Sequence, residues 1–215
     1  LPGARATAPE QKARLNDCRK LLEDLGHIVE PVKIDYDAEA FSQSSVRIWA
    51  TTLTYFMDAF AAITGRKIGP KTCEAVTLEV YKFGQALKAT EMEGAMIQQN
   101  KICRTVGQVM RKYDVLLTPG LARDVAKLGE LDQNAKGVDM MAWWNHILMN
   151  YSAFTPLFNS TGQPAVMLPL YQAKSGLPLA MQFVGRLGDE ETLYSLAGQL
   201  EQALPWSGRR APNYG

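Results

Sequence analysis

The side chains that could carry out chemistry are few in this sequence and lie far apart. Ser42, Ser44 and Ser45 form a hydroxyl cluster, but no His or Lys stands at a familiar spacing that would activate a serine nucleophile. Serine at the start of a helical pattern is typical of a helix cap, so we interpret these three as structural. The sequence also lacks GxSxG, HExxH and SxxK motifs, a phosphate-binding P-loop and a GxGxxG after a strand. These residues predict no catalytic centre within the chain.

Metal-ligating residues predict no site either. His27 and His146 are far apart, and no cysteine is close in sequence to either of them. The three cysteines, Cys18, Cys73 and Cys103, have spacings that match neither a CxxC pair nor a disulfide framework. Each falls on the apolar stripe of an expected helix, so we expect buried, reduced thiols in a cytoplasmic protein. We predict no metal and no other cofactor, and we interpret His146 as a structural histidine.

Composition limits the class of partner. The 215 residues suffice for one large domain or two small ones, and 23 basic against 22 acidic side chains give a net charge of +1. Nucleic-acid binding would need a basic face, whereas the charges here are interspersed. No apolar run reaches the roughly 20 residues of a membrane span. The start Leu1-Pro2-Gly3 indicates a trimmed, nicked or truncated terminus.

The fold class follows from the stretch between Phe154 and Arg186. Two apolar runs, 165–170 and 179–184, are separated by polar and turn residues, which is typical of a β-hairpin. Both runs are apolar nearly throughout, so we expect both strands to be covered on both faces, as in an α/β sheet between helices. Turn residues predict a loop from Asn159 to Pro164. A helix is predicted after Asp189, whose carboxylate can cap it.

The beginning of the chain looks like half of a βαβ unit. The pattern predicts a helix from Thr7 to Leu25 with Gly26 at its C-terminal end, followed by a strand from His27 to Lys33. The strand that should precede this helix has no room before residue 7. We therefore expect the chain to open in the middle of a fold.

Three helices and a strand are predicted next. The helices run from Phe41 to Ile63, from Lys71 to Leu87, and from a capping box at Thr90–Glu93 to about Lys112. Residues expected to face inward on them are Val46, Trp49, Ala50, Leu53, Phe56, Met57, Phe60, Cys73, Met96 and Cys103. A strand is then predicted from Tyr113 to Thr118. No internal repeat or linker divides the chain.

A pocket is expected beyond the end of that strand. Ligands of open α/β sheets lie past the carboxyl ends of strands, so Thr118 and Pro119 are candidates for the pocket wall. A helix is predicted from Asp139 to Tyr151, and it brings Trp144 near Phe154 in a stretch rich in Met and aromatic residues. Such a stretch fits either ordinary core or the lining of an apolar substrate cleft, and the sequence leaves both open.

Several segments of this chain resemble the C-terminal part of amidase signature enzymes. They match best the bacterial branch that contains 6-aminohexanoate cyclic dimer hydrolases and aryl acylamidases. The resemblance lies in the segment Phe154–Ala165, in Leu168-Pro169-Leu170, Gly176-Leu177-Pro178, Gln182–Arg186 and Asp189-Glu190, and further in Leu25-Gly26-His27, the strand YDVLLTP, Leu200-Glu201, Pro205-Trp206 and Arg209. It implies an α/β fold with a mixed β-sheet core covered by helices. Residues 1–215 would be the C-terminal portion of a single amidase domain.

The resemblance also implies a function. The family's nucleophilic Ser, bridging Ser and Lys base lie in an N-terminal portion that this chain does not contain, so that portion is the expected partner. The expected substrate is a small, uncharged, fairly hydrophobic amide, anilide or urethane. The expected pocket residues are Trp49, Thr118, Pro119, Trp144, Phe154 and Asn159. The alternative is a non-catalytic scaffold or binding subunit with an amidase-like framework. Whether the complete enzyme is a homodimer stays open.

Overall fold

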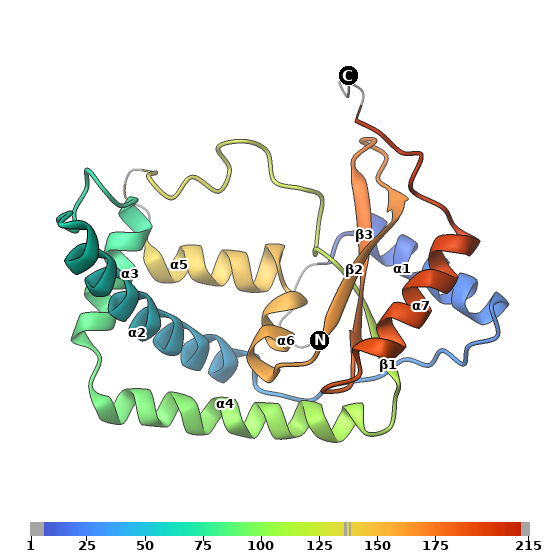
Figure 1. Cartoon of the computed structure of the whole chain (residues 1–215), viewed down its shortest axis with the longest axis horizontal. Coiled ribbons are helices and arrows are strands. Elements are labelled where there is room, and N and C mark those ends of the chain that lie inside the picture. The colour runs from blue at the N-terminus through green and yellow to red at the C-terminus, as the bar shows by residue number, and fades with distance from the viewer. Residues whose placement is uncertain (1–6, 136, 138, 212–215) are drawn as a thin grey trace.

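A three-stranded sheet lies between helices on both faces (Figure 1). The structure is a computed structural model and describes residues 7–135, 137 and 139–211. Strands β1 (Val115–Pro119), β3 (Pro178–Gly185) and β2 (Ala165–Gln172) lie in this order, and both neighbouring pairs are antiparallel. The α/β class is confirmed. All pairings among the described strands are antiparallel.

The predicted hairpin is present in β2 and β3. Ala173 and Leu177 close the turn, where the Ala173 amide donates to the Leu177 carbonyl at 2.8 Å. Gly176 has φ +82°, a conformation that a residue with a side chain rarely adopts. β3 is buried along most of its length, as expected, because it is central. The expectation is wrong for β2, whose residues alternate towards solvent because it is an edge strand among the described residues.

Helices α1 (Pro9–Asp24) and α7 (Glu190–Ala203) cover one face of the sheet (Figure 1). The core on that face consists of Cys18 and Leu22 of α1, Leu193 and Leu200 of α7, and Leu168, Leu170, Ala173, Leu179, Met181 and Phe183. Alternate strand residues supply this core because side chains of a strand point to opposite faces in turn. The predicted cap of α7 is confirmed, since the Asp189 carboxylate accepts from the amide of Thr192 at 3.4 Å and from its hydroxyl at 2.7 Å.

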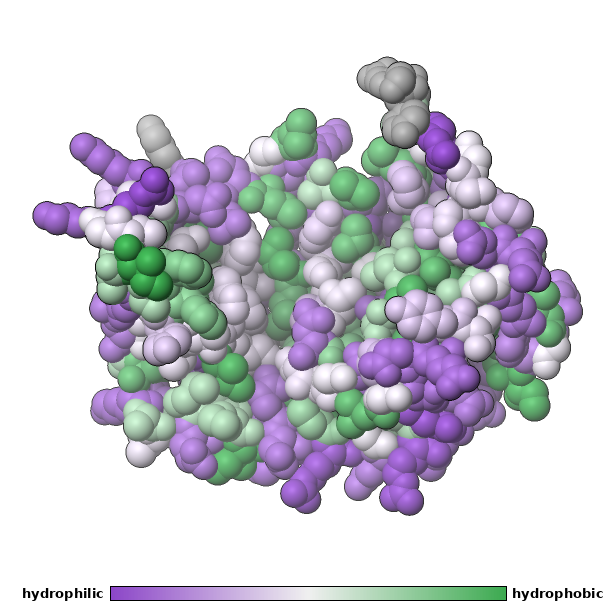
Figure 2. All heavy atoms as spheres, in the orientation of Figure 1, coloured by the Kyte–Doolittle hydropathy of each residue, from purple (hydrophilic) through white to green (hydrophobic). Residues whose placement is uncertain are grey.

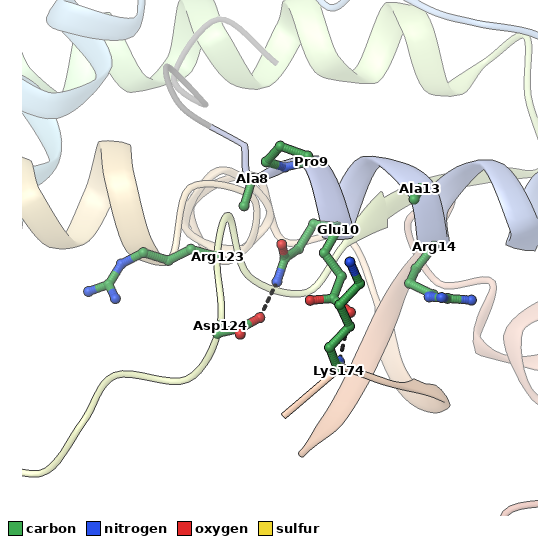
Figure 3. Close-up of a pocket in the computed structure, with 9 residues that line it drawn as sticks. Ala8, Pro9, Glu10, Ala13, Arg14, Arg123, Asp124 and Lys174 are labelled. Atoms are coloured by element: carbon green, nitrogen blue, oxygen red, sulfur yellow. Dashed lines mark hydrogen bonds between the residues drawn. The ribbon is translucent and has the colours of Figure 1, made fainter. Parts of the chain in front are cut away.

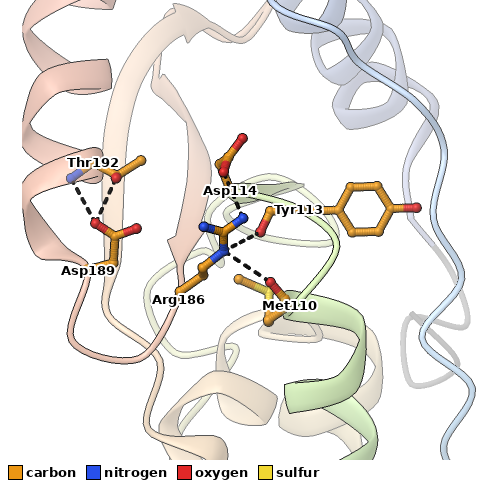
Figure 4. A network of polar contacts seen from close by, with 6 residues as sticks. All are labelled: Met110, Tyr113, Asp114, Arg186, Asp189 and Thr192. Carbon is orange, nitrogen blue, oxygen red and sulfur yellow. Dashed lines mark hydrogen bonds and ion pairs between the residues drawn. The ribbon is translucent and has the colours of Figure 1, made fainter.

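The other face packs against α4 (Ala89–Met110), the π-helix η1 (His146–Tyr151) and α6 (Thr155–Thr161). Arg186 ties this layer to the sheet (Figure 4). Its Nε donates to the carbonyl oxygens of Met110 at 3.3 Å and Tyr113 at 3.0 Å, and its Nη2 pairs with the Asp114 carboxylate at 2.8 Å. A cation at the C-terminal end of a helix satisfies free carbonyls and suits the helix dipole.

The remaining helices form a layer that extends away from the sheet (Figure 1). These are α2 (Ala38–Thr64), α3 (Ala75–Ala86) and α5 (Met140–Asn145), and α5 continues directly into η1, which confirms the predicted helix from Asp139 to Tyr151. Val46 and Ala50 of α2 are buried as expected. Phe56 and Phe60 are 51% and 62% exposed, so the inward prediction is wrong for these two residues. Hydrophobic side chains also reach the surface over this layer in Figure 2.

Three other local predictions are corrected by the structure. The segment 27–37 is extended but pairs with no strand among the described residues, so the strand from His27 to Lys33 is absent. The capping box of α4 begins at Lys88, whose amide donates to the Glu91 carboxylate at 3.0 Å, and not at Thr90. The chain between residues 159 and 161 is the last turn of α6, so the predicted loop begins only at Gly162.

Burial differs from the expectation at Cys73, Cys103 and Met96, and agrees with it at Cys18. Cys18 is fully buried, whereas Cys73 and Cys103 are half-buried, and all three are free thiols. Cys73 precedes α3 instead of lying on it. Met96 is 53% exposed. Within the described ranges, no helix is both long and apolar enough to cross a membrane.

Candidate functional site

Two of the six expected pocket residues stack directly on each other. Trp49 of α2 and Trp144 of α5 have ring centroids 5.0 Å apart and planes inclined by 25°. Ser42, which is fully buried about two turns before Trp49 on the same helix, accepts a hydrogen bond from Trp144 Nε1 at 3.1 Å. Its hydroxyl donates to Asn145 Oδ1 at 2.9 Å. Ser42 therefore holds the indole of Trp144 at its N–H group.

The Ser42 hydroxyl has no base beside it. Its two hydrogen-bond partners are an indole N–H, which can only donate, and a neutral side-chain amide, which is not a proton acceptor in catalysis. A serine nucleophile needs an adjacent group that takes its proton. The structural interpretation of this serine cluster thus agrees with the geometry, although Ser42 anchors a tryptophan and does not cap the helix. Asp37 provides the cap, and it accepts from the Ala40 amide at 2.9 Å.

Two buried side-chain polar atoms on α4 and α5 have no hydrogen-bond partner among the described residues. Gln99 of α4 donates from Nε2 to Ser45 Oγ at 2.6 Å. Gln99 Oε1 and Trp143 Nε1 are buried, and neither has a hydrogen-bond partner among the residues that the structure describes. Buried polar groups are usually satisfied, so these two atoms are exceptions among the described residues.

A second polar pair lies at the carboxyl end of β1. Thr118 and Gln182 face each other across β1 and β3, and Gln182 Nε2 donates to Thr118 Oγ1 at 3.0 Å. Both side chains are buried, and the Thr118 hydroxyl donates to the carbonyl of Pro119 at 3.0 Å. This contact fixes the end of the strand at the position where a ligand of an α/β sheet would lie. The role of Gln182 could not be predicted, because its partner Thr118 is 64 residues away in the chain.

The other two expected pocket residues lie elsewhere. Phe154 is 5% exposed and packs with Ala122 and Ala153 in a small core cluster. Asn159 is exposed near the end of α6. The structure thus brings Trp49 and Trp144 into contact and places Thr118 next to Pro119 in β1. It does not join all six residues in one cavity of the described part.

Two neighbouring cavities of about 680 and 260 Å³ lie at the start of α1, and Figure 3 shows residues that line the larger one. They share Gln11, Arg123 and Asp124, and none of the six expected residues lines either cavity. Gln11 Nε2 donates to Asp124 Oδ1 at 3.1 Å, and the amide of Lys174 donates to Glu10 at 2.8 Å. The walls come from α1, the loop after β1 and the hairpin turn. Such distant segments give no common sequence pattern, so these cavities could not be predicted.

Titratable groups with perturbed pKa values are structural. Burial raises the pKa of the Cys18 thiol from 9.0 to about 12 and also raises the pKa of the neighbouring Tyr171 hydroxyl. The Glu30 carboxylate beside Tyr113 raises the pKa of that hydroxyl. No cluster of His, Cys, Asp or Glu that could hold a metal ion exists among the described residues. These pKa shifts follow from burial and from neighbouring side chains.

Comparison with known proteins decides the family. The model of the family described as Amidase matches residues 3–194. The chain belongs to the amidase family. It is 31% identical to the putative amidase AmiC of Mycobacterium leprae (strain TN) over 207 residues, which are 94% of this chain and 42% of that protein. It is 39% identical to the 6-aminohexanoate-cyclic-dimer hydrolase of Pseudomonas sp. (strain NK87) over 101 residues, which are 46% of this chain and 20% of that protein.

Solved amidase structures have the same fold. A 6-aminohexanoate cyclic dimer hydrolase superposes with a TM-score of 0.87 and 27% identity, over 98% of this amidase chain and 45% of the other chain. A bacterial aryl acylamidase of the amidase signature family superposes with a TM-score of 0.76 and 19% identity, over 97% of this chain and 44% of that one. The amidase chain described here thus spans less than half the length of the relatives that it matches.

Proposed function

We propose that this chain is the C-terminal portion of a complete amidohydrolase whose nucleophilic Ser, bridging Ser and Lys base lie in an N-terminal portion. The observation that carries the proposal is the likeness to a 6-aminohexanoate cyclic dimer hydrolase over 98% of this chain but only 45% of the hydrolase. The described residues contain no nucleophile with a base beside it. If the catalytic residues lie in the N-terminal portion, this chain is expected to have the fold of a hydrolase but no catalytic residues of its own.

In the proposed reaction, the serine oxygen attacks the amide carbonyl and passes its proton through the bridging Ser to the neutral Lys. The amine leaves with a proton, and water then cleaves the acyl-enzyme ester and restores the serine. A lysine acts as a base only when its amine is neutral, and a dry environment lowers its pKa because burial disfavours the charged form. We propose that the present chain forms an apolar wall that keeps water away from this Lys.

The substrate pocket is proposed to include Trp49 and Trp144, with Thr118, Pro119, Phe154 and Asn159 at its boundaries. None of these six side chains is charged, and the largest two form an aromatic stack with half-buried faces. This chemistry suits an uncharged, fairly hydrophobic amide, anilide or urethane. A carboxylate in the same place would lose its hydration without gaining a cation in return. All three cysteines are free thiols, which is the usual state in the reducing cytoplasm, so we propose a cytoplasmic enzyme.

The proposal is tested by hydrolysis assays on the complete protein that contains this chain. The substrates are matched pairs of 4-nitroanilides with the same acyl chain, which ends in a methyl group in one member and in a carboxylate in the other. We expect kcat/KM to be at least about 10-fold higher for the neutral member, a difference of about 1.4 kcal/mol in transition-state binding. Equal or reversed preference would contradict the proposed pocket. Hydrolysis of neither substrate class would favour a non-catalytic scaffold.

A further inference from the structure

The smaller of the two cavities at the start of α1 is lined mainly by apolar side chains. Val125, Met167 and Leu177 line it, and they are 50%, 43% and 46% exposed. They come from the loop after β1, from β2 and from the hairpin turn, so three segments that are distant in the sequence expose large hydrophobic side chains at one place. Single exposed hydrophobic side chains are common, whereas several that line one cavity indicate a binding site for an apolar group.

Gln11 contributes an unused hydrogen-bond acceptor to this cavity. Its side chain is 3% exposed and lines both cavities. Its Nε2 donates to Asp124 Oδ1 at 3.1 Å, and its Oε1 is buried without a hydrogen-bond partner among the described residues. An ionised carboxylate only accepts, so the nitrogen of Gln11 must face Asp124 and its oxygen points elsewhere. Buried acceptors without a partner are rare, which indicates that a ligand supplies the donor.

Asp124 gives this cavity a negative charge. The charged residues that line the smaller cavity are Arg123 and Asp124. Arg123 forms an ion pair with Glu130, and its guanidinium lies 5.0 Å from the centre of the Tyr151 ring. Figure 3 shows the Arg123 side chain pointing away from Asp124. The Asp124 carboxylate has no ion-pair partner in the part of the chain that the structure describes.

A carboxylate and an amide oxygen beside an apolar cavity suit a primary ammonium group on a hydrocarbon chain. An ammonium has three N–H donors and a charge opposite to that of Asp124, and its bonds to a carboxylate are charge-assisted. A carboxylate or phosphate ligand would have the same sign of charge as Asp124. The larger cavity is less suitable for an ammonium, because Arg14 and Lys174 line it together with Glu10.

We propose that the smaller cavity binds an apolar primary amine in its ammonium form. The ammonium group bonds to Gln11 Oε1 and to the Asp124 carboxylate. The hydrocarbon chain lies between Val125, Met167 and Leu177. Hydrolysis of an apolar amide releases an amine of this class. That source of the ligand rests on the proposed function, but the binding site does not.

Titration calorimetry of the complete protein with hexylamine tests the proposed ligand class. At pH 7 a primary alkylamine is protonated, as lysine is. 1-Hexanol and hexanoate provide ligands of similar length that are neutral and negatively charged. We expect hexylamine to bind at least about 10-fold more tightly than either of them, because only the ammonium forms charge-assisted bonds to the carboxylate. Butylamine should bind more weakly, by about 4-fold for each methylene removed from the apolar cavity.

Three substitutions and one NMR signal locate the bound amine. Asp124→Asn keeps an acceptor for the Gln11 amide but removes the charge, and Gln11→Met keeps a side chain of similar length but removes the acceptor. Each should raise the Kd for hexylamine at least about 10-fold. Asp24→Asn is the matched control, since this exposed carboxylate lies at the other end of α1, and it should leave the Kd unchanged. The ¹³C signal of the Met167 methyl group, assigned with Met167→Leu, should shift when hexylamine is added.

The outcomes separate this inference from the proposed function. Absence of binding would overturn the site, and so would equal affinity for hexylamine and for 1-hexanol or hexanoate. An unchanged Kd in Asp124→Asn or in Gln11→Met, or an unmoved Met167 signal, would overturn it because the amine would then bind elsewhere. A protein that binds hexylamine as predicted but hydrolyses no amide would support the site and contradict the proposed function. An active amidase with an unmoved Met167 signal would do the reverse.

Discussion

The indole Nε1 of Trp144 donates its hydrogen bond to the hydroxyl of Ser42, 102 residues away in the chain, at 3.1 Å. This bond joins α5 to α2, the two helices that carry the stacked Trp144 and Trp49. Ser42→Ala leaves the indole N–H and the Asn145 amide oxygen without this partner in a buried place. We expect the free energy of unfolding of the complete protein to fall by about 1–3 kcal/mol in urea denaturation. Ser175→Ala, at an exposed position in the hairpin turn, should change it by less than about 0.5 kcal/mol. Equal effects of the two substitutions would contradict this role.

Trp49 is expected to affect substrate binding more than stability. An aromatic stack adds about 0.5–1.5 kcal/mol beyond the burial of its area, and Trp49 is only half-buried. In the complete enzyme, Trp49→Ala should therefore raise KM for aryl amides several-fold, with a smaller rise for Trp49→Phe, which keeps an aromatic ring. Steady-state kinetics with both variants provide the measurement. An unchanged KM in Trp49→Ala would remove this residue from the proposed pocket.

The crossing of α2 and α3 depends on Gly84. A Cβ atom at this position would lie 2.5 Å from the backbone oxygen of Ala50 and would also meet Thr54 Oγ1. Backbone atoms cannot move aside cheaply, so Gly84→Ala should destabilise the protein by about 1–3 kcal/mol through overpacking. Gly107→Ala, in α4 where no atom lies within 4 Å of the added Cβ, is the control. It should stabilise by about 0.5–1 kcal/mol, because alanine favours a helix more than glycine. Thermal unfolding of both variants would distinguish these effects, and equal shifts in Tm would contradict the packing.

Alkaline pH should destabilise the fold through Cys18. Burial raises the pKa of its thiol from 9.0 to about 12, so the folded protein keeps a proton that the unfolded chain loses. Unfolding therefore releases protons between these two values, and stability falls as pH rises through this window. At pH 10.5 the loss from this thiol is about 2 kcal/mol relative to pH 8. Urea denaturation at both pH values measures it. The loss should shrink by that amount in Cys18→Ala and persist in Cys73→Ala, and an equal loss in Cys18→Ala would contradict the prediction.

Elements that depend on local signals were predictable. The hairpin, the helix that begins after Asp189 and the strand at Val115 follow from apolar runs and turn residues within a few positions of each other. Segment 27–37 shows the opposite case. Its sequence favours a strand, but a strand needs a neighbour to complete its hydrogen bonds, and the described residues provide none.

The candidate site was predictable only in part. Trp49 and Trp144 were both expected in the pocket wall, and the structure stacks them. Asn159 was expected in a loop, but α6 continues through it and leaves it exposed. The anchoring role of Ser42 depends on a contact across 102 residues, and no periodicity or spacing reports such a contact.

Labelling of the complete protein with a serine-reactive fluorophosphonate, followed by peptide mapping, tests most directly whether the nucleophile lies outside these 215 residues. The account predicts one labelled serine, located in the N-terminal portion, and no label on any serine of this chain, including Ser42. A labelled serine within this chain, or a hydrolytically active protein with no labelled serine, would contradict it.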